Sequence, residues 1–176
     1  MADFLPFLYR NRFSVCWPRI LKFLKQLRED EDTTLPVGIA GFCWGGLHTI
    51  KLSHDAAESK AKDERPLADA FFTAHPSNIT VPQDIADVKL NLSIAIGDDD
   101  GVMKIKRVRE AKAILESKTD VDSEVIIYPG AKHGFSIRAS RARPDSEETK
   151  QAENAERQAI AWFQRCFEAA RQNQAQ

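Results

Sequence analysis

Gly41-Phe42-Cys43-Trp44-Gly45-Gly46 is the stretch that decides the fold. It leaves a short apolar run at residues 37–40 and enters a run with helical character, so it predicts a sharp turn from a strand into a helix. The glycines beside Cys43 allow the backbone to approach closely at a strained turn. A thiol at its apex would have the position of a nucleophile elbow. Helix N–H groups and the helix dipole there favour the thiolate, the nucleophilic form of cysteine.

Two other interpretations of Cys43 remain open. Free cysteine is among the most buried residue types, so Cys43 could be a small core residue in a glycine-rich turn. An exposed thiolate could also serve as a redox sensor, with Cys16 or Cys166 approaching it in space.

Length, charge and cysteine content narrow the class of protein. The 176 residues suit one domain, residues 1–176, and the 25 basic and 26 acidic residues give a net charge of -1, which argues against a nucleic-acid partner. The three cysteines lack a CxxC pair, so neither a disulfide framework nor a thiolate zinc site is expected. The sequence lacks a basic signal-peptide start and a long apolar run, and predicts a cytoplasmic protein that does not bind membranes.

Strand-like and helix-like segments alternate along the chain. We expect strands at residues 37–42, 68–74, 90–96 and 124–128, and helices at 17–28, 45–53, 104–118 and from about 145 to 167. Pro18 is expected at the first position of its helix, Pro82 at the start of a short one, and Asp145 with Glu148 as a capping box. This alternation predicts an α/β fold with a parallel sheet and helices on both faces.

Reactive side chains follow three of these strands. Cys43 follows the first, Asp99 the third and His133 the fourth, and sites in parallel α/β sheets form outside the carboxyl ends of strands. Nucleophile, acid and base in this order is the chain order of α/β-hydrolases. His133 would accept the thiol proton and Asp99 would orient the imidazole and stabilise imidazolium. We also expect His75 and Phe135 to bind substrate, with core packing as the alternative for His75.

Three motifs resemble the dienelactone hydrolase family of cysteine-dependent α/β-hydrolases. They are Gly-Phe-Cys-Trp-Gly-Gly at 41–46, Gly-Asp-Asp-Asp-Gly-Val at 97–102 and Tyr-Pro-Gly-Ala-Lys-His-Gly-Phe at 128–135, and the resemblance extends from about Trp17 to Phe167. It implies Cys43 as nucleophile, His133 as base and Asp99 as acid, with Asp98 as the fallback. The implied reaction is hydrolysis of lactones or small activated esters through an acyl-cysteine intermediate, without metal or organic cofactor.

The chain also departs from that family. Family members carry further strands before the helix that precedes the nucleophile strand, so we expect an N-terminally truncated version of the fold. The N–H of Trp44 would be one oxyanion donor, and the loop that carries the second would be absent. Exposed strand edges would remain, which a homodimer could cover. The alternative function is therefore a non-catalytic remnant that binds a ligand or dimerises.

A third family interpretation is disfavoured by chain order. Class I glutamine amidotransferases also have a GxCxG turn, but their acid follows closely after the histidine. Here Asp99 lies well before His133.

Overall fold

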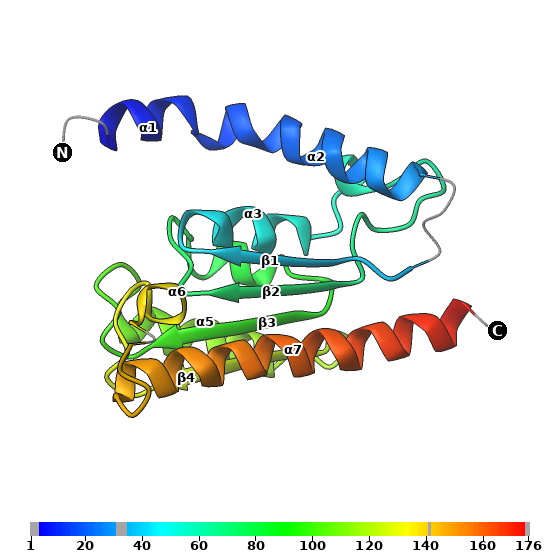
Figure 1. Cartoon of the computed structure of the whole chain (residues 1–176). Coiled ribbons are helices and arrows are strands. Elements are labelled where there is room, and N and C mark those ends of the chain that lie inside the picture. Colours follow the sequence, from blue (N-terminus) through cyan, green and yellow to red (C-terminus); the bar gives the residue numbers. More distant parts are fainter. Residues whose placement is uncertain (1–3, 31–34, 141, 175–176) are drawn as a thin grey trace.

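A computed structural model describes residues 4–30, 35–140 and 142–174 (Figure 1). Four strands form one sheet, and helices connect and flank them. The strands are β1 (Gly38–Phe42), β2 (Ala70–Ala74), β3 (Leu92–Gly97) and β4 (Ser123–Tyr128). The helices are α1 (Phe4–Arg10), α2 (Phe13–Glu29), α3 (Trp44–Leu52), η1 (a 3-10 turn, Ala57–Ser59), α4 (Gln83–Ala86), α5 (Ile105–Glu116), α6 (Phe135–Arg138) and α7 (Glu147–Gln174).

All neighbouring strands of the sheet run parallel, in the order β1-β2-β3-β4. Strand order follows chain order, so every connection returns to the same end of the sheet and all carboxyl ends lie at one edge. The predicted parallel α/β sheet is confirmed.

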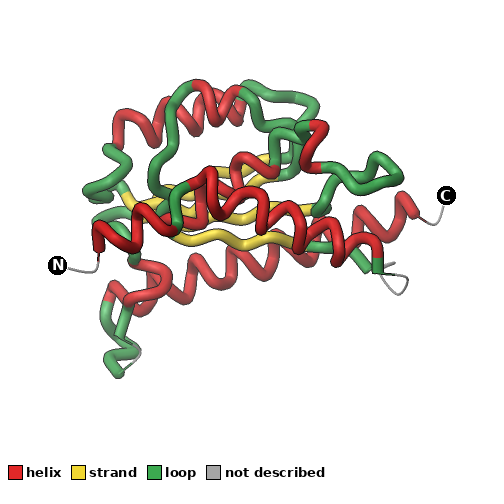
Figure 2. The backbone as a smooth tube through the Cα atoms, turned by 90° about the horizontal axis from the view of Figure 1, so that it is seen from above, coloured by secondary structure: helices red, strands yellow, loops and turns green. Residues whose placement is uncertain are grey.

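Helices cover both faces of this sheet (Figures 1 and 2). One face packs residues of α2, α3, α4 and α5 against the strands, and α7 covers the other. Alternate side chains of a strand point to opposite faces. Phe71 accordingly joins the first core and Phe72 the second, and both are 1 % exposed.

The expected strands match the observed ones to within about two residues, because short, fully apolar runs mark buried parallel strands. The first expected helix is displaced. Helix α2 begins at Phe13, so Pro18 lies inside it rather than at its first position. The aromatic ring of Phe13 stacks on Trp17 at 5.0 Å and on His48 of α3 at 5.2 Å, and these contacts hold the extra turn against α3.

Other helix ends also differ from expectation. The short helices α1 and α6 were not expected. The expected capping box at Asp145 is wrong, because Ser146 precedes α7 and its hydroxyl accepts the Thr149 N–H at 3.2 Å. Within the part of the chain that the structure describes, no helix combines the length and apolar character needed to cross a membrane.

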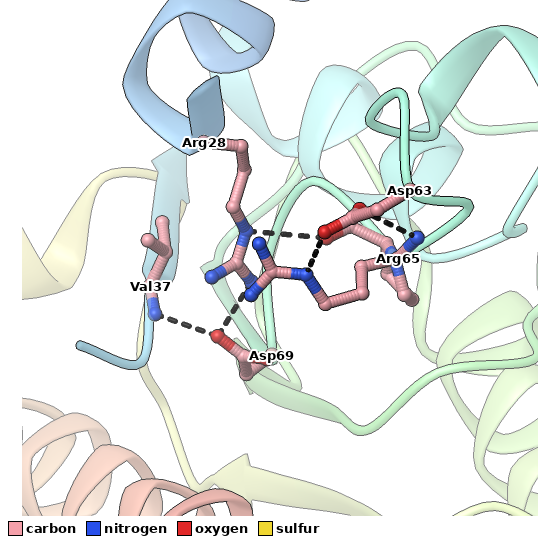
Figure 3. A network of polar contacts seen from close by, with 6 residues as sticks. Arg28, Val37, Asp63, Arg65 and Asp69 are labelled. Carbon is pink, nitrogen blue, oxygen red and sulfur yellow. Dashed lines mark hydrogen bonds and ion pairs between the residues drawn. The ribbon is translucent and has the colours of Figure 1, made fainter. Parts of the chain in front are cut away.

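A buried arginine fixes the end of α2 to the starts of β1 and β2 (Figure 3). The Arg28 side chain is 1 % exposed, and its Nη2 lies 2.6 Å from Oδ2 of Asp69. The same oxygen accepts the Val37 N–H at 2.7 Å, while Arg28 Nε donates to the Pro66 carbonyl at 3.2 Å. The contact joins three segments and holds the amino end of β1, the strand that leads to Cys43.

We expect Arg28→Met to lower the free energy of unfolding by about 2 kcal/mol, because it removes a buried charged partner from Asp69. Urea denaturation measures the change. Lys62→Met is the matched control, since it breaks the contact of an 83 % exposed lysine with Glu29. This control substitution should lower the free energy of unfolding by less than about 1 kcal/mol. Equal losses in the two variants would contradict a structural role for the Arg28 contact.

Candidate active site

Cys43 stands at the turn between β1 and α3 with a backbone φ of 50° and ψ of -113°. A positive φ is uncommon for a residue other than glycine and marks local strain. The turn is held from both sides, because the Cys43 N–H donates to the Ala74 carbonyl at 3.2 Å and its carbonyl accepts the Ser77 N–H at 3.0 Å. The predicted strained elbow is therefore present.

Two glycines of the motif make this elbow sterically allowed. A Cβ at Gly41 would lie 2.6 Å from the Gly45 carbonyl oxygen, and one at Gly46 would lie 2.5 Å from Cβ of Pro76. A Cβ at Gly45 would meet nothing within 4 Å. The close approach of α3 to β1 therefore needs Gly41, and its approach to the end of β2 needs Gly46, whereas Gly45 is not required for space.

His133 brings Cys43 and an aspartate together. Its Nε2 lies 3.0 Å from Sγ of Cys43, and its Nδ1 lies 3.0 Å from Oδ2 of Asp100. The three residues come from the ends of β1, β3 and β4, as the parallel topology requires. A thiol, an imidazole and a carboxylate in this sequence of contacts can pass a proton from sulfur to nitrogen and stabilise the resulting imidazolium.

The expected acid Asp99 is not the residue beside His133. The structure places Asp100 there, while Asp98 and Asp99 are exposed. The Asp100 side chain is fully buried, and its Oδ1 accepts the N–H groups of Val102 at 2.7 Å and Met103 at 3.1 Å. These bonds turn its carboxylate inward. The fallback Asp98 instead accepts the Gly130 N–H at 2.6 Å and ties the two loops together.

The choice among three consecutive aspartates could not be made from the sequence, because it depends on where the turn after β3 reverses. Gly97 is part of that geometry. A Cβ there would lie 1.8 Å from the Ala131 carbonyl oxygen, so the loop that carries His133 packs directly on the end of β3. Of the three aspartates, Asp100 is the one whose carboxylate reaches His133.

Two residues expected to bind substrate have different positions. Phe135 lines a cavity of about 210 Å³ beside His133, together with Lys132 and Arg138. The expectation for His75 is wrong, because its side chain is 0 % exposed and packs behind His133. Burial lowers the pKa of His75 to about 4, and the charge of His133 acts in the same direction.

Trp44 is the first residue of α3, and the first N–H groups of a helix lack an intrahelical acceptor. Its indole ring lies 4.4 Å from the ring of the buried His48 and 6.4 Å from that of Phe7 in α1. These contacts hold the beginning of α3 in place. They were not anticipated from the sequence, since they depend on the position of α1 and α2.

The other two cysteines lie apart from this group. Cys166 of α7 is buried, and burial raises its pKa to about 11, so its thiol stays protonated at neutral pH. Cys16 of α2 lies 3.9 Å from Oδ1 of Asn11. Among the described residues, no three histidine, cysteine or acidic side chains are grouped so as to hold a metal ion.

Comparison with known proteins shows the family of this chain. The model of the dienelactone hydrolase family matches residues 12–167, and the chain belongs to this family. The match includes the three motifs around Cys43, Asp100 and His133. Comparison with curated proteins finds no match.

Solved structures share the fold at low sequence identity. A candidate dienelactone hydrolase from Klebsiella pneumoniae subsp. pneumoniae is 19% identical with a TM-score of 0.58, over 85% of this chain and 59% of that one. The dienelactone hydrolase-like promiscuous phosphotriesterase P91 from metagenomic libraries is 17% identical with a TM-score of 0.63, over 94% of this chain and 67% of that one. Esterase PE8 is 17% identical with a TM-score of 0.51, over 79% of this chain and 59% of that one. This chain therefore spans only about three fifths to two thirds of the length of these proteins.

Asp100→Asn and Asp99→Asn form a matched pair for identifying the acid. Asn at position 100 can still accept the two backbone N–H groups, but it loses the charge that stabilises imidazolium. We expect iodoacetamide to alkylate Cys43 of Asp100→Asn about tenfold more slowly at pH 6.5, since less thiolate forms without the imidazolium.

The same measurement on Asp99→Asn should stay close to the wild-type rate, because this side chain is exposed. Slow alkylation in Asp99→Asn with a normal rate in Asp100→Asn would contradict the assignment.

Proposed function

We propose that this protein hydrolyses lactones or small activated esters through an acyl-cysteine intermediate on Cys43. The observation that carries the proposal is the continuous contact of Sγ of Cys43 with Nε2 of His133, and of Nδ1 of His133 with Asp100, each at 3.0 Å. Membership of the dienelactone hydrolase family supports the same class of reaction.

Acylation begins with the thiolate of Cys43 beside the imidazolium of His133. The sulfur attacks the carbonyl carbon, a C–S bond forms, and the carbonyl electrons move to the oxygen to give a tetrahedral oxyanion. The Trp44 N–H at the start of α3 is suited to donate to this oxyanion. Collapse breaks the C–O bond, and His133 gives its proton to the departing alkoxide. In a lactone the alcohol stays attached to the acyl group.

Deacylation uses the same groups in reverse. Neutral His133 takes a proton from a water molecule as the water oxygen attacks the thioester carbon. The C–S bond then breaks, the acid product leaves, and thiolate and imidazolium are restored. Asp100 keeps the Nδ1 proton of His133 in place, so that Nε2 faces the sulfur in both halves of the reaction.

Substrate class follows from the chemistry of the site rather than from a neighbour's name. A thiolate with a nearby imidazolium favours carbonyl carbons with good leaving groups. The cavity beside His133 has Phe135 as an apolar wall, and its two cationic side chains, Lys132 and Arg138, are accompanied by the anionic Glu148. We therefore expect esters and lactones with a small apolar body.

Release of 4-nitrophenol from 4-nitrophenyl acetate tests the reaction. We expect Cys43→Ala to abolish turnover above background, a loss of at least about 100-fold, because it removes the nucleophile. Cys16→Ala is the matched control and should keep wild-type activity, since Cys16 lies in α2 outside the site. Equally slow release by wild type and Cys43→Ala would reject the proposal.

Diethyl 4-nitrophenyl phosphate in the same assay distinguishes attack on a phosphorus atom from attack on a carbonyl carbon. Hydrolysis of the acetate ester alone would support carbonyl chemistry. Hydrolysis of the phosphate triester alone would contradict the proposed substrate class.

A second proposal concerns the outer edge of β1, to which nothing pairs within the described ranges. The Val37 carbonyl and the Cys43 N–H both bond toward β2, so the intervening even-numbered residues turn their backbone groups outward. Gly38, Ala40 and Phe42 are exposed, whereas every residue of β2 and β3 is buried. An open strand edge of this kind pairs readily with another strand.

Apolar hollows lie on both sides of this edge. One of about 390 Å³ lies between α2, β1 and α3, and one of about 330 Å³ lies between Phe42 and α7. We propose that the β1 edge of a second copy of the chain pairs here and forms a homodimer. Dimerisation is the alternative function if the thiol proves inert.

Analytical ultracentrifugation measures this association. Ala40→Pro removes an outward N–H without breaking the β1–β2 bonds, so we expect it to give a monomer with an unchanged circular dichroism spectrum. Ala40→Ser keeps the N–H and should remain a dimer. A wild-type protein that sediments as a monomer at all concentrations would rule out this association.

A further inference from the structure

His75 is a buried titratable side chain in contact with the base of the site. Its ring centroid lies 5.2 Å from that of His133, with the two planes at 68°, and it is 0 % exposed. The ring of Phe135 also packs against His75, with the centroids 5.8 Å apart. A buried ring in an edge-to-face contact limits how far the neighbouring ring can turn.

Two bonds and an unusual backbone conformation fix His75 itself. The ring Nε2 of His75 lies 2.8 Å from Oγ of Ser136. The backbone N–H of His75 donates to the Ala95 carbonyl at 2.8 Å. Its φ is 39°, a value that persists only where the surroundings impose it. Ser136 belongs to α6, the short helix that begins two residues after His133. The His75–Ser136 contact therefore joins the end of β2 to the segment that carries the base.

Burial, helped by neighbouring positive charges, keeps the ring of His75 neutral. Burial is the largest cause of its low pKa of about 4, and the positive charges of His133 and Arg138 lower it further. Asp100 and a backbone hydrogen bond oppose this effect but do not reverse it. A neutral ring adds no like charge when His133 becomes imidazolium, so His75 can support that cation without repelling it.

Cys43 and Asp100 contact opposite nitrogens of His133, and neither contact alone fixes the plane of its ring. An imidazole held at two nitrogens can still tilt about the line that joins them. Contact with His75 restrains this tilt, because the His75 ring packs against the His133 ring and does not bond to either of its nitrogens.

We propose that His75, held by Ser136, is a positioning residue that fixes the ring of His133 so that Nε2 stays aimed at Sγ of Cys43. This inference rests on the proposed thiolate–imidazolium pair. It assigns His75 no contact with substrate and no proton transfer. Its expected effect is on how much thiolate forms near neutral pH.

Alkylation of Cys43 by iodoacetamide, followed by mass spectrometry from pH 5 to pH 10, measures the thiolate without any substrate. The reference is an unassisted thiol, which reacts with a midpoint near about pH 8.5. We expect His75→Phe and Ser136→Ala to slow alkylation at pH 6.5 by about tenfold, part of the 10²–10⁴-fold effect of a positioned base. The profile of both variants should move toward that of an unassisted thiol.

Two further variants separate positioning from simple loss of structure. The amide of His75→Gln can still reach Ser136 but removes the ring that lies against His133, so we expect it to slow alkylation as His75→Phe does. A wild-type profile in this variant would contradict a role for the ring contact. Ser117→Ala is the serine control, because the exposed Ser117 only donates to the Ile114 carbonyl at 2.7 Å beyond α5. It should keep the wild-type profile. Circular dichroism checks folding, and if His75→Phe does not fold, Ser136→Ala and His75→Gln decide.

Wild-type profiles in folded Ser136→Ala and His75→Phe would overturn the inference. Ester hydrolysis by the wild-type protein distinguishes failure of the inference about His75 from failure of the proposed function. An active wild type with unchanged variant profiles rejects the role of His75 alone. An inactive wild type whose variants still shift the thiol profile rejects the hydrolase and keeps the role of His75.

Discussion

The close approach of α3 to β1 at Gly41, and to the end of β2 at Gly46, is the constraint on which the rest of the site depends. It leaves no space for a Cβ at either position, and it forces Cys43 into a positive φ that turns the thiol out of the sheet. The same turn sets Trp44 at the start of α3. A wider approach would let the turn relax and would move the sulfur away from His133, because the position of the sulfur follows the backbone of the turn.

The parallel sheet converts this local turn into a three-residue group. The ends of β1, β3 and β4 each lead to one member of the group, and the four strands lie side by side in chain order. Contacts between loops then set the distances within the group. Asp98 ties the loop after β3 to Gly130, and Gly97 lets the backbone at Ala131 come close. Asp98, exposed and outside the group of three, therefore acts on the geometry of the site rather than on its chemistry.

Burial separates two neutral side chains, Cys166 and His75, from the pair formed by Cys43 and His133. Cys166 and His75 are both removed from water, so each is held in its neutral form, the thiol by a raised pKa and the imidazole by a lowered one. Cys43 and His133 remain partly accessible and lie within contact of each other. Of the three thiols, Cys43 is the one that lies within contact of His133.

The sequence by itself determined the alternation of strands and helices, the elbow at Cys43 and the involvement of His133, because short apolar runs, flanking glycines and strand-end residues are local patterns. Tertiary structure alone decided that Asp100 and not Asp99 meets His133, that His75 is buried behind the base, and that α2 begins before Pro18. Each of these depends on where a turn reverses or on which ring packs against which. Residues far apart in the chain determine these features, so no local pattern of residues could predict them.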